Sequence, residues 1–316
     1  MRCDGKWSVI YRTELRPPDR TVTVRLEGKP VAAARDSASR AAVAAAPAGT
    51  PPPSLVSVHR GVESPFRFYL RRQAKAAAQV GIAFRDDPLG PTAGPSELVA
   101  RLRALDADPA VHAVLLEHPL PPPFDFYAAV AVLRPRKDVD GVGPENLGRL
   151  VTQRPVHVPA VALAAIDIAR HYHLPLEGER VAVIGRSETV GLPLALLLAG
   201  KSTGIDATVT LLHSKTRDLA GALAGARTIF SCVGRPGLLT RAVVPRGANV
   251  VDVGLSSVPD PSRPGGQVPA GDADAASLDG WADSLTPVPG GVGPVTVAEL
   301  IANTVRAWQR RDEGTG

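Results

Sequence analysis

Glycines follow one of the clearest strand patterns in the sequence, at a place where a phosphate group could be held. The strand pattern GERVAVIG ends at Gly185, and the residues from there to Gly191 read GRSETVG. Glycines in such a turn let the backbone come close to a phosphate at the start of the next helix. The spacing is not GxGxxG, and an ordinary turn is the simpler interpretation of this segment taken alone.

The next strand pattern, ATVTLLHS, ends without the acidic residue that an NAD-selective site places there. Its tip carries His213, Ser214 and Lys215. Together with Arg186 in the preceding turn, these residues offer hydrogen bonds and positive charge to a 2′-phosphate, so the pattern favours NADP. The alternative, that Arg186 and Lys215 are only solvated loop charges, stays open at this point.

A third candidate segment lies near the carboxyl end. TPVPGGVGPVT, from Thr286 to Thr296, holds three prolines and three glycines. Proline restricts the backbone and glycine frees it, so such a loop is shaped for close approach to another group. We expect it to face a ligand, with a purely structural turn as the alternative.

Alternating helix and strand patterns supply the elements that must position these segments. In the first half we expect helices over 31–46, 66–80, 96–107 and 124–133, strands over 54–59 and 111–116, and a loop over 134–150. A helix over 159–171 leads to a second half with four strands and a helix over 191–199. The alternation predicts parallel sheets, so the expected fold is α/β with two domains, the second doubly wound.

Length and composition exclude several classes of protein. A chain of 316 residues, at roughly 150 per domain, suggests about two domains. The net charge of +5 comes from 36 Lys and Arg against 31 Asp and Glu, which are scattered, so nucleic acid binding is not expected. No signal-peptide or membrane-spanning pattern and no metal-ligand spacing is present. Cys3 and Cys232 lie far apart, and we expect a reduced, cytoplasmic protein.

Six motifs share their order and spacing with one known family. They are KDVDG at 137–141, NLGRL at 146–150, VAVIGRSETVGLP at 181–193, ATVTLLHSKT at 207–216, NVVDVG at 249–254 and TPVPGGVGPVT at 286–296. Over about residues 27 to 305, the chain resembles the methylenetetrahydrofolate dehydrogenase/cyclohydrolase family. The resemblance implies an N-terminal α/β domain that faces a Rossmann domain across a cleft, a last helix that crosses back, and a homodimer.

The resemblance also implies a division of the chain and a reaction. Residues 1–26 stay unplaced, 27–155 form the folate-like substrate domain, 156–285 form the NADP-binding domain, and 286–316 form a substrate-facing loop and the returning helix. The substrate is expected to be a tetrahydrofolate derivative. In the family, a hydride passes from the one-carbon bridge of methylenetetrahydrofolate to the nicotinamide. Water then attacks the methenyl cation and gives 10-formyltetrahydrofolate.

Carrying the family's site onto this sequence gives candidate residues. The catalytic Tyr falls on Tyr69 and the pterin-binding Asp on Asp140, while the family's Lys and Gln fall on Gln73 and Glu117. The implied cofactor-binding residues are Gly185, Arg186, Ser187, Gly191, His213, Ser214, Lys215 and Gly234, and the implied substrate-binding residues are Tyr69, Asp140, Pro289, Gly290, Gly291, Val292 and Gly293. Asp272 is a candidate for lining the cleft, with a turn-forming role as the alternative.

The change from Lys to Gln bears most directly on function. Tyr69 and Gln73 are four residues apart and share a helix face, whereas Lys75, six residues from Tyr69, points elsewhere. Hydride transfer needs stabilisation of positive charge but no proton transfer by the protein, and water addition needs proton transfer. Because an amide has no accessible pKa, we expect the cyclohydrolase step to be lost or weak. A carboxyl at Glu117 with a pKa raised by burial could act as a base instead.

Three functions follow from these departures. The first is an NADP-dependent methylenetetrahydrofolate dehydrogenase without the hydrolytic step, and it is the one we favour. The second is a repurposed oxidoreductase of specialised metabolism that acts on a different imine, iminium or aminal. The third is a non-catalytic paralogue that acts as a partner subunit. Retention of Tyr69, Asp140, Arg186, Ser214 and the PVPGGVGP loop at 287–294 argues against a loss of all function.

Overall fold

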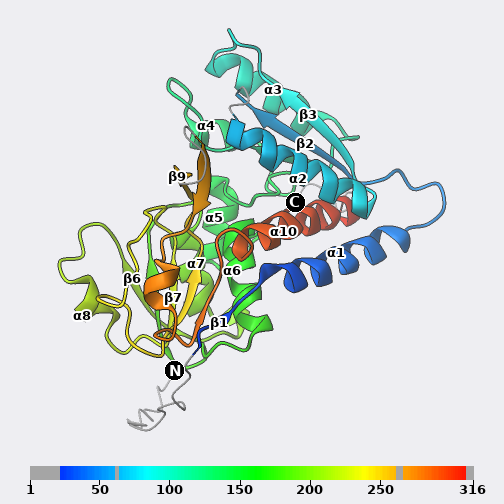
Figure 1. Cartoon of the computed structure of the whole chain (residues 1–316). Coiled ribbons are helices and arrows are strands. Elements are labelled where there is room, and N and C mark those ends of the chain that lie inside the picture. Colours follow the sequence, from blue (N-terminus) through cyan, green and yellow to red (C-terminus); the bar gives the residue numbers. More distant parts are fainter. Residues whose placement is uncertain (1–21, 61–63, 261–265, 311–316) are drawn as a thin grey trace, which may run out of the picture.

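The structure, a computed structural model, describes residues 22–60, 64–260 and 266–310 and divides them between two α/β domains (Figure 1). Each domain is built on a parallel sheet, and two long helices run between the domains. The expected two-domain α/β fold is confirmed. The first 21 residues, most of the stretch that stayed unplaced by sequence, lie outside the described part of the chain.

The first domain holds a three-stranded sheet in the order β3-β2-β4, with β2 (Ser54–His59) between β3 (Ala83–Pro88) and β4 (Ala113–Leu116). All pairs are parallel. Alternate residues of β2 face opposite sides, as strand geometry requires. Val56 and Val58 pack in the core beside α3 (Pro95–Ala107) and α4 (Phe126–Val130), while Leu55 packs toward α2 (Ser64–Val80).

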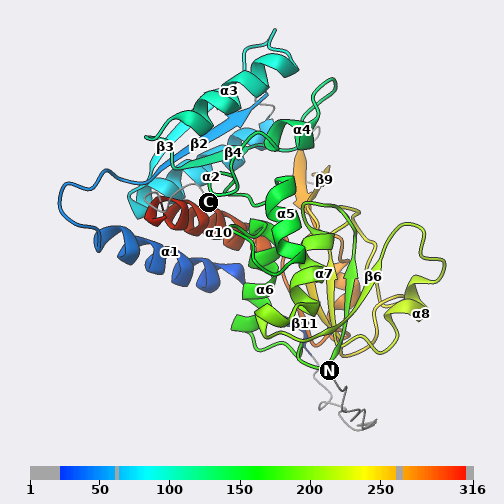
Figure 2. The ribbon, with the colours of Figure 1, turned by 180° about the vertical axis from the view of Figure 1, so that it is seen from behind.

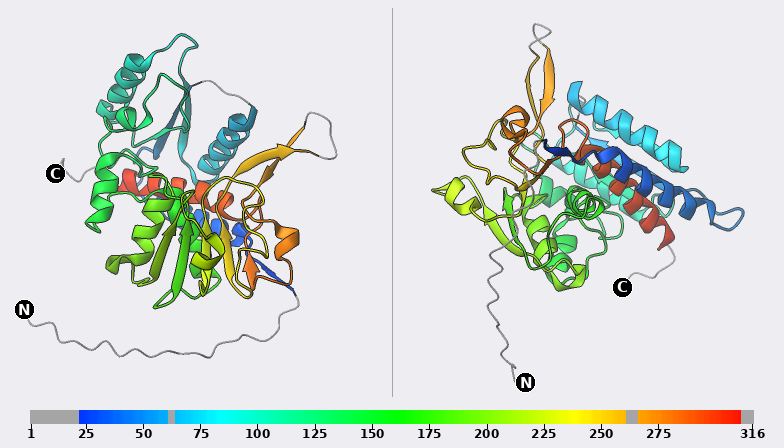
Figure 3. Two further views of the ribbon diagram at one scale, coloured as in Figure 1. Left: turned by 90° about the vertical axis from the view of Figure 1, so that its left-hand side faces the viewer. Right: turned by 60° about the horizontal axis from the view of Figure 1, so that its bottom comes forward.

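The second domain holds a six-stranded parallel sheet in the order β1-β11-β8-β7-β5-β6. Its strands are β1 (Val24–Arg25), β5 (Arg180–Ile184), β6 (Thr208–Leu212), β7 (Thr228–Ser231), β8 (Asn249–Asp252) and β11 (Ser284–Leu285). Its helices are α5 (Pro144–Val151), α6 (Ala160–His171), α7 (Gly191–Ala199), the 3-10 helix η1 (Lys201–Thr203), α8 (Leu219–Leu223) and α9 (Ala275–Leu278). An antiparallel hairpin, β9 (Ser256–Pro259) with β10 (Gln267–Ala270), projects from this domain (Figure 3).

Helices α1 (Gly28–Ala44) and α10 (Val292–Gln309) lie side by side and join the two domains (Figures 1 and 2). The start of α10 packs in the core of the second domain through Val295 and Ala298, and its end packs in the first through Ile301 and Trp308. The prediction that the last helix crosses back is therefore confirmed.

The junction of these two helices depends on a glycine. The backbone N–H of Gly28 donates to the carbonyl of Gly290 over 2.8 Å. A Cβ atom at residue 28 would lie 1.8 Å from the carbonyl oxygen of Gly291, a distance that no side chain can accept. The start of α1 is thus held directly against the loop that leads into α10.

Two local predictions were wrong, and strand β3 was not predicted. Residues 134–150 are not only loop, because α5 begins at Pro144, where proline suits the first helical position and Glu145 suits the first turn. The helix predicted over 124–133 covers only 126–130. Strand β3 was missed because an edge strand carries charged residues such as Asp86, which hide its alternation.

Among the described helices, none combines the length and apolar character needed to cross a bilayer.

Candidate active site

Four side chains with acid, base or hydrogen-bonding groups meet where the strands of the first sheet end. Glu117 directly follows β4, and its backbone N–H donates to the carbonyl of Val58 on β2 over 2.9 Å. On the other side of β4, Val114 forms a parallel β-bridge with Asp138, so the segment that leads to Asp140 runs alongside β4. Because parallel strands share their carboxyl edge, this places Glu117 and Asp140 at one edge of the sheet.

Helix α2 covers this face of the sheet and supplies Tyr69 and Gln73. The two residues lie one helical turn apart, as their spacing predicted. Gln73 is fully buried, and its side-chain Nε2 donates to Oε1 of Glu117 over 2.9 Å. The hydroxyl of Ser57 donates to the same oxygen over 3.0 Å. The two residues onto which the sequence resemblance maps the family's Lys and Gln are therefore hydrogen-bonded to each other.

No described lysine replaces the missing ammonium at this site. The side chains of Lys29, Lys75, Lys201 and Lys215 are exposed. The ammonium of Lys137 donates instead to the carbonyls of Leu105 and Asp108, where α3 ends. The prediction that Lys75 points away from the site agrees with this placement.

The carboxyls of the site have altered acidity. Burial raises the pKa of Glu117 above its ordinary range, and the hydrogen bonds from Gln73 and Ser57 oppose this by favouring the carboxylate. Desolvation and the nearby charges of Asp138 and Glu117 raise the pKa of Asp140 to about 7. Burial, with Glu117 and Asp140 close by, also raises the pKa of the Tyr69 hydroxyl, which stays protonated at neutral pH.

One polar atom of the site is left without a partner. The side-chain oxygen of Gln73 is buried and accepts no hydrogen bond from the residues that the structure describes. A buried amide oxygen without a donor is costly, so it marks a position for a ligand donor. Gln73 can therefore orient a bound molecule while its nitrogen holds Glu117.

The two acids of the KDVDG motif have different surroundings: Asp138 holds the loop in place, and Asp140 lies at the site. Asp138 is buried and accepts hydrogen bonds from the N–H groups of Gly141 and Gly143 and from the side chain of Asn146. Gly141 has a φ of 71°, and a Cβ there would lie 2.7 Å from the backbone of Val158. This network fixes the loop and leaves the partly exposed Asp140 to face a ligand.

The candidate cofactor residues gather at the carboxyl edge of the second sheet. Strands β5 and β6 are neighbours, so the turn from Gly185 and the tip at Ser214 and Lys215 lie at the same edge. Gly185 has a φ of 113°, and a Cβ at Gly191 would lie 2.1 Å from its carbonyl oxygen. Both glycines are therefore required by the close packing of this turn, which opens α7 as a phosphate-binding turn does.

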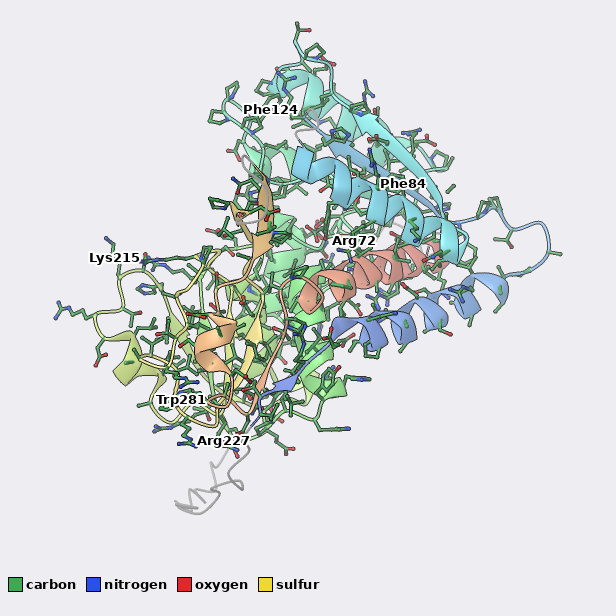
Figure 4. The ribbon with its side chains drawn as sticks, in the orientation of Figure 1. Arg72, Phe84, Phe124, Lys215, Arg227 and Trp281 are labelled. Carbon is green, nitrogen blue, oxygen red and sulfur yellow. The ribbon has the colours of Figure 1, made fainter. Side chains whose placement is uncertain are left out.

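Two hydrogen bonds of His213 order the turn that follows β6. Nδ1 of His213 accepts from the N–H of Lys215 over 3.2 Å, and the backbone N–H of His213 donates to the hydroxyl of Thr216. Ser214 and Lys215 are exposed, as is Arg186 on the neighbouring turn. Figure 4 shows Lys215 projecting from the outer side of this domain. His213 thus shapes the tip, and the exposed residues remain available to a phosphate.

Two buried acids shape the neighbouring loops. Asp272 is fully buried and accepts from the Ser231 hydroxyl and from the N–H groups of Val233 and Arg235, which flank Gly234. Asp252 in turn accepts from the N–H of Asp272. Of the two roles open for Asp272 on the sequence, positioning this loop is the one observed. Asp252 was missed because its only sequence signal is its place at the end of a strand.

A hydrogen bond that sequence reasoning missed links the two domains at this edge. The Tyr127 hydroxyl, on α4, donates to the carboxylate of Glu188, in the turn that follows β5, over 3.1 Å. Desolvation and the interaction with Glu188 raise the pKa of Tyr127 to about 12. The contact joins the first domain directly to the candidate phosphate turn.

The carboxyl-terminal loop presents only part of its residues. Pro289 and Gly293 are exposed, Gly290 is partly exposed, and Gly291 is buried. The side chain of Val292 packs in the hydrophobic core of the second domain. Of this set, Pro289, Gly290 and Gly293 have the accessibility that contact with a substrate requires.

Comparison with known proteins matches both domains. Residues 26–140 match the catalytic domain, and residues 159–312 the NAD(P)-binding domain, of the model for tetrahydrofolate dehydrogenase/cyclohydrolase. This chain belongs to the tetrahydrofolate dehydrogenase/cyclohydrolase family. The resemblance stated from the sequence motifs is thereby confirmed.

Individual members of the tetrahydrofolate dehydrogenase/cyclohydrolase family align over most of their length. The "Bifunctional protein FolD" of Nocardia farcinica is 41% identical over 288 residues, which cover 91% of this chain and 98% of that protein. The protein of the same name from Desulfovibrio desulfuricans is 40% identical, over 85% of this chain and 92% of that protein. A Trypanosoma brucei methylenetetrahydrofolate dehydrogenase-cyclohydrolase structure, complexed with NADP and an inhibitor, gives a TM-score of 0.85 at 34% identity, covering 92% of this chain and 99% of that chain.

Proposed function

We propose that this protein is an NADP-dependent methylenetetrahydrofolate dehydrogenase whose cyclohydrolase step is lost or weak. The observation that carries this proposal is the buried hydrogen bond between Gln73 and Glu117. The sequence resemblance assigns these two residues, an amide and a carboxylate, to the positions of the family's Lys and Gln. Family membership supports the substrate class, a tetrahydrofolate derivative.

The site has the groups that hydride removal needs. Loss of hydride leaves positive charge on the one-carbon bridge, and NADP⁺ supplies the hydride acceptor. A carboxylate in a partly desolvated site stabilises such charge more strongly than it would in water. Glu117, held by Gln73 and Ser57, is placed to do this, and Asp140 is available to bind the pterin ring.

Proton transfer for water addition lacks its usual group. The amide of Gln73 can donate and accept hydrogen bonds, but it cannot exchange a proton near neutral pH. Because its pKa is raised, the Tyr69 hydroxyl stays protonated at neutral pH and is not available as a base. Burial raises the pKa of Glu117, but its Oε1 already accepts hydrogen bonds from Gln73 and Ser57, so that oxygen is not free to accept a proton from the attacking water. Hydrolysis of the methenyl product should therefore be slow.

The second domain has a surface that fits NADP. The glycine turn from Gly185 to Gly191 leaves backbone room for a phosphate, and exposed Arg186, Ser214 and Lys215 stand at neighbouring strand ends. An arginine, a hydroxyl and an ammonium suit a 2′-phosphate, and no acid at the tip of β6 competes for the ribose. A homodimer, implied by the family resemblance, and a cytoplasmic location, expected from the sequence, remain predictions.

One assay tests the proposal. Purified protein is mixed with NADP⁺ and methylenetetrahydrofolate, and NADPH and the methenyl chromophore are followed independently. Both should rise, and the methenyl signal should then decay no faster than it does in buffer. Faster decay would contradict the hydrolytic part, and absence of both signals with intact NADP binding would move the assignment to a different imine or iminium substrate. Failure to bind NADP or folate by calorimetry would favour a partner subunit.

A further inference from the structure

A histidine that the hydride transfer does not itself require lies beside the candidate site. His59 is the last residue of β2, and its side chain is only 3% exposed. Its Nε2 lies 2.7 Å from Oδ1 of Asp86 on β3, whose side chain is 53% exposed. A buried imidazole is thus tied to a carboxylate that reaches solvent.

Strand register brings this imidazole next to Glu117. Ser57 pairs with Leu115, and Val58 pairs with Leu116, so the next pair in the ladder is His59 with Glu117. The backbone bond from Glu117 N–H to the carbonyl of Val58 carries the ladder on to this pair. Neighbouring strands lie about 4.8 Å apart, and paired residues point to the same face.

The hydrogen bond from Ser57 supports this placement independently. Ser57 reaches Oε1 of Glu117, and His59 is two residues along the same strand, on the same face. Asp86 pairs in register with Ser57, so its side chain also shares that face. The carboxyl ends of β3, β2 and β4 therefore carry Asp86, His59 and Glu117 side by side.

The electrostatic effect of His59 on Glu117 has a clear direction. Burial raises the pKa of Glu117, whereas the nearby imidazole lowers it because a positive charge favours the carboxylate. Asp86 by itself acts in the opposite direction. Among the described residues, Tyr69 of α2 and Asp140 beyond β4 also interact with this carboxyl, and Arg72 of α2 lies near Tyr69.

We infer that His59, oriented by Asp86, is a positioning residue that keeps Glu117 ionised beside the one-carbon bridge. The inference rests on the proposed hydride transfer for its consequence in catalysis. An ionised Glu117 stabilises the positive charge that develops on the bridge, and a protonated one does not. The rate should then fall at low pH when Glu117 takes up its proton.

The first test needs no substrate. The titration of Glu117 is followed by infrared difference spectroscopy, with Glu117→Gln as the blank that identifies its carbonyl band. In His59→Gln the midpoint should rise by roughly one pH unit, the size expected on losing an opposite charge about 5 Å away. His112→Gln is the matched control, because His112 flanks the other end of the same sheet and contacts Ser54. Its midpoint should equal that of the wild type.

Asp86→Asn separates two roles of the surface carboxylate and serves if His59→Gln does not fold. If Asp86 orients His59, its loss should raise the Glu117 midpoint. If Asp86 acts only through its own charge, its loss should lower the midpoint, which would overturn the three-residue arrangement. An unchanged midpoint in His59→Gln would overturn the inference entirely.

The second test uses turnover. In His59→Gln, the acid limb of the pH profile of kcat/KM for NADPH formation should shift to higher pH by the same amount as the infrared midpoint. NADPH formation with unshifted profiles contradicts the inference and leaves the proposed function intact. A shifted infrared midpoint in a protein that forms no NADPH contradicts the proposed function and leaves the charge pair intact.

Discussion

Restoring a lysine at position 73 should not by itself restore hydrolysis. In the structure, Nε2 of Gln73 lies 2.9 Å from Oε1 of Glu117, so the ammonium of a Gln73→Lys variant would form an ion pair with that carboxylate. A pair about 4 Å apart at an effective dielectric constant of about 20 gains roughly 4 kcal/mol. That corresponds to an upward shift of about three units in the pKa of the lysine.

The consequence for proton transfer is large. At pH 7.5, an unperturbed lysine is a free amine in roughly one molecule in a thousand. Pairing with Glu117 would reduce this fraction by about another thousandfold. The double variant Gln73→Lys with Glu117→Gln removes the pairing, and burial then lowers the pKa of the lysine toward neutrality. Only the double variant should hydrolyse the methenyl compound.

The assay is the loss of the methenyl chromophore, corrected for its decay in buffer, for the wild type, both single variants and the double variant. The double variant should be faster than the wild type by about a hundredfold or more, the range for a positioned general base. Both single variants should stay within about threefold of the wild type. If the Gln73→Lys single variant hydrolysed the methenyl compound as fast as the double variant, Glu117 would not be what keeps the introduced lysine protonated.

Four further predictions concern other parts of the molecule. In the wild type, the KM for the folate should rise as the pH falls through about 7, because Asp140 becomes protonated. In Asp140→Asn this pH dependence should be absent, as measured by steady-state kinetics. Ser214→Asp should raise the Kd of NADPH by about tenfold or more while sparing that of NADH, measured by nucleotide fluorescence, because an acid repels the 2′-phosphate. Tyr127→Phe should raise the KM for NADP⁺ by no more than about fivefold, since the lost bond to Glu188 is exposed and worth about 1 kcal/mol or less. Glu299 is buried beside Arg35 and Asp167, and burial raises its pKa in the folded protein above the ordinary value of 4.5. Its contribution to stability is therefore present at low pH and is lost as the pH rises through the pKa of the folded state. Between pH 5 and 8, the Tm of Glu299→Gln should fall less than the Tm of the wild type, as measured by calorimetry.

The sequence predicted those parts of the fold in which a local pattern and the tertiary structure agree. Helix α7 begins and ends where its pattern predicted, at Gly191 and Ala199, because the glycine turn precedes it and Gly200 follows. The pattern of α5 was misread, because proline and glycine near Pro144 look like a loop until the helix is seen to bury Asn146 and Leu150. Polar edge strands such as β3 carry no alternation to detect.

The candidate site was predictable only in part, for a related reason. Tyr69, Gln73, Glu117 and Asp140 came from motif positions, and the structure brings Gln73 and Glu117 into contact. His59 and Asp86 came from no motif. Their relation depends on the register between β2 and its neighbours, which a single sequence does not specify. The hydrogen bond of Tyr127 likewise depends on how the two domains meet.

The close backbone contact of Gly28 with Gly290 and Gly291 has a consequence for folding during translation. Helix α1 emerges from the ribosome well before its backbone partners at Gly290 and Gly291 are synthesised. The strand at Val24 likewise waits for Ser284. One buried cluster in each domain includes residues of α10, so these parts of both cores stay incomplete until α10 has been synthesised.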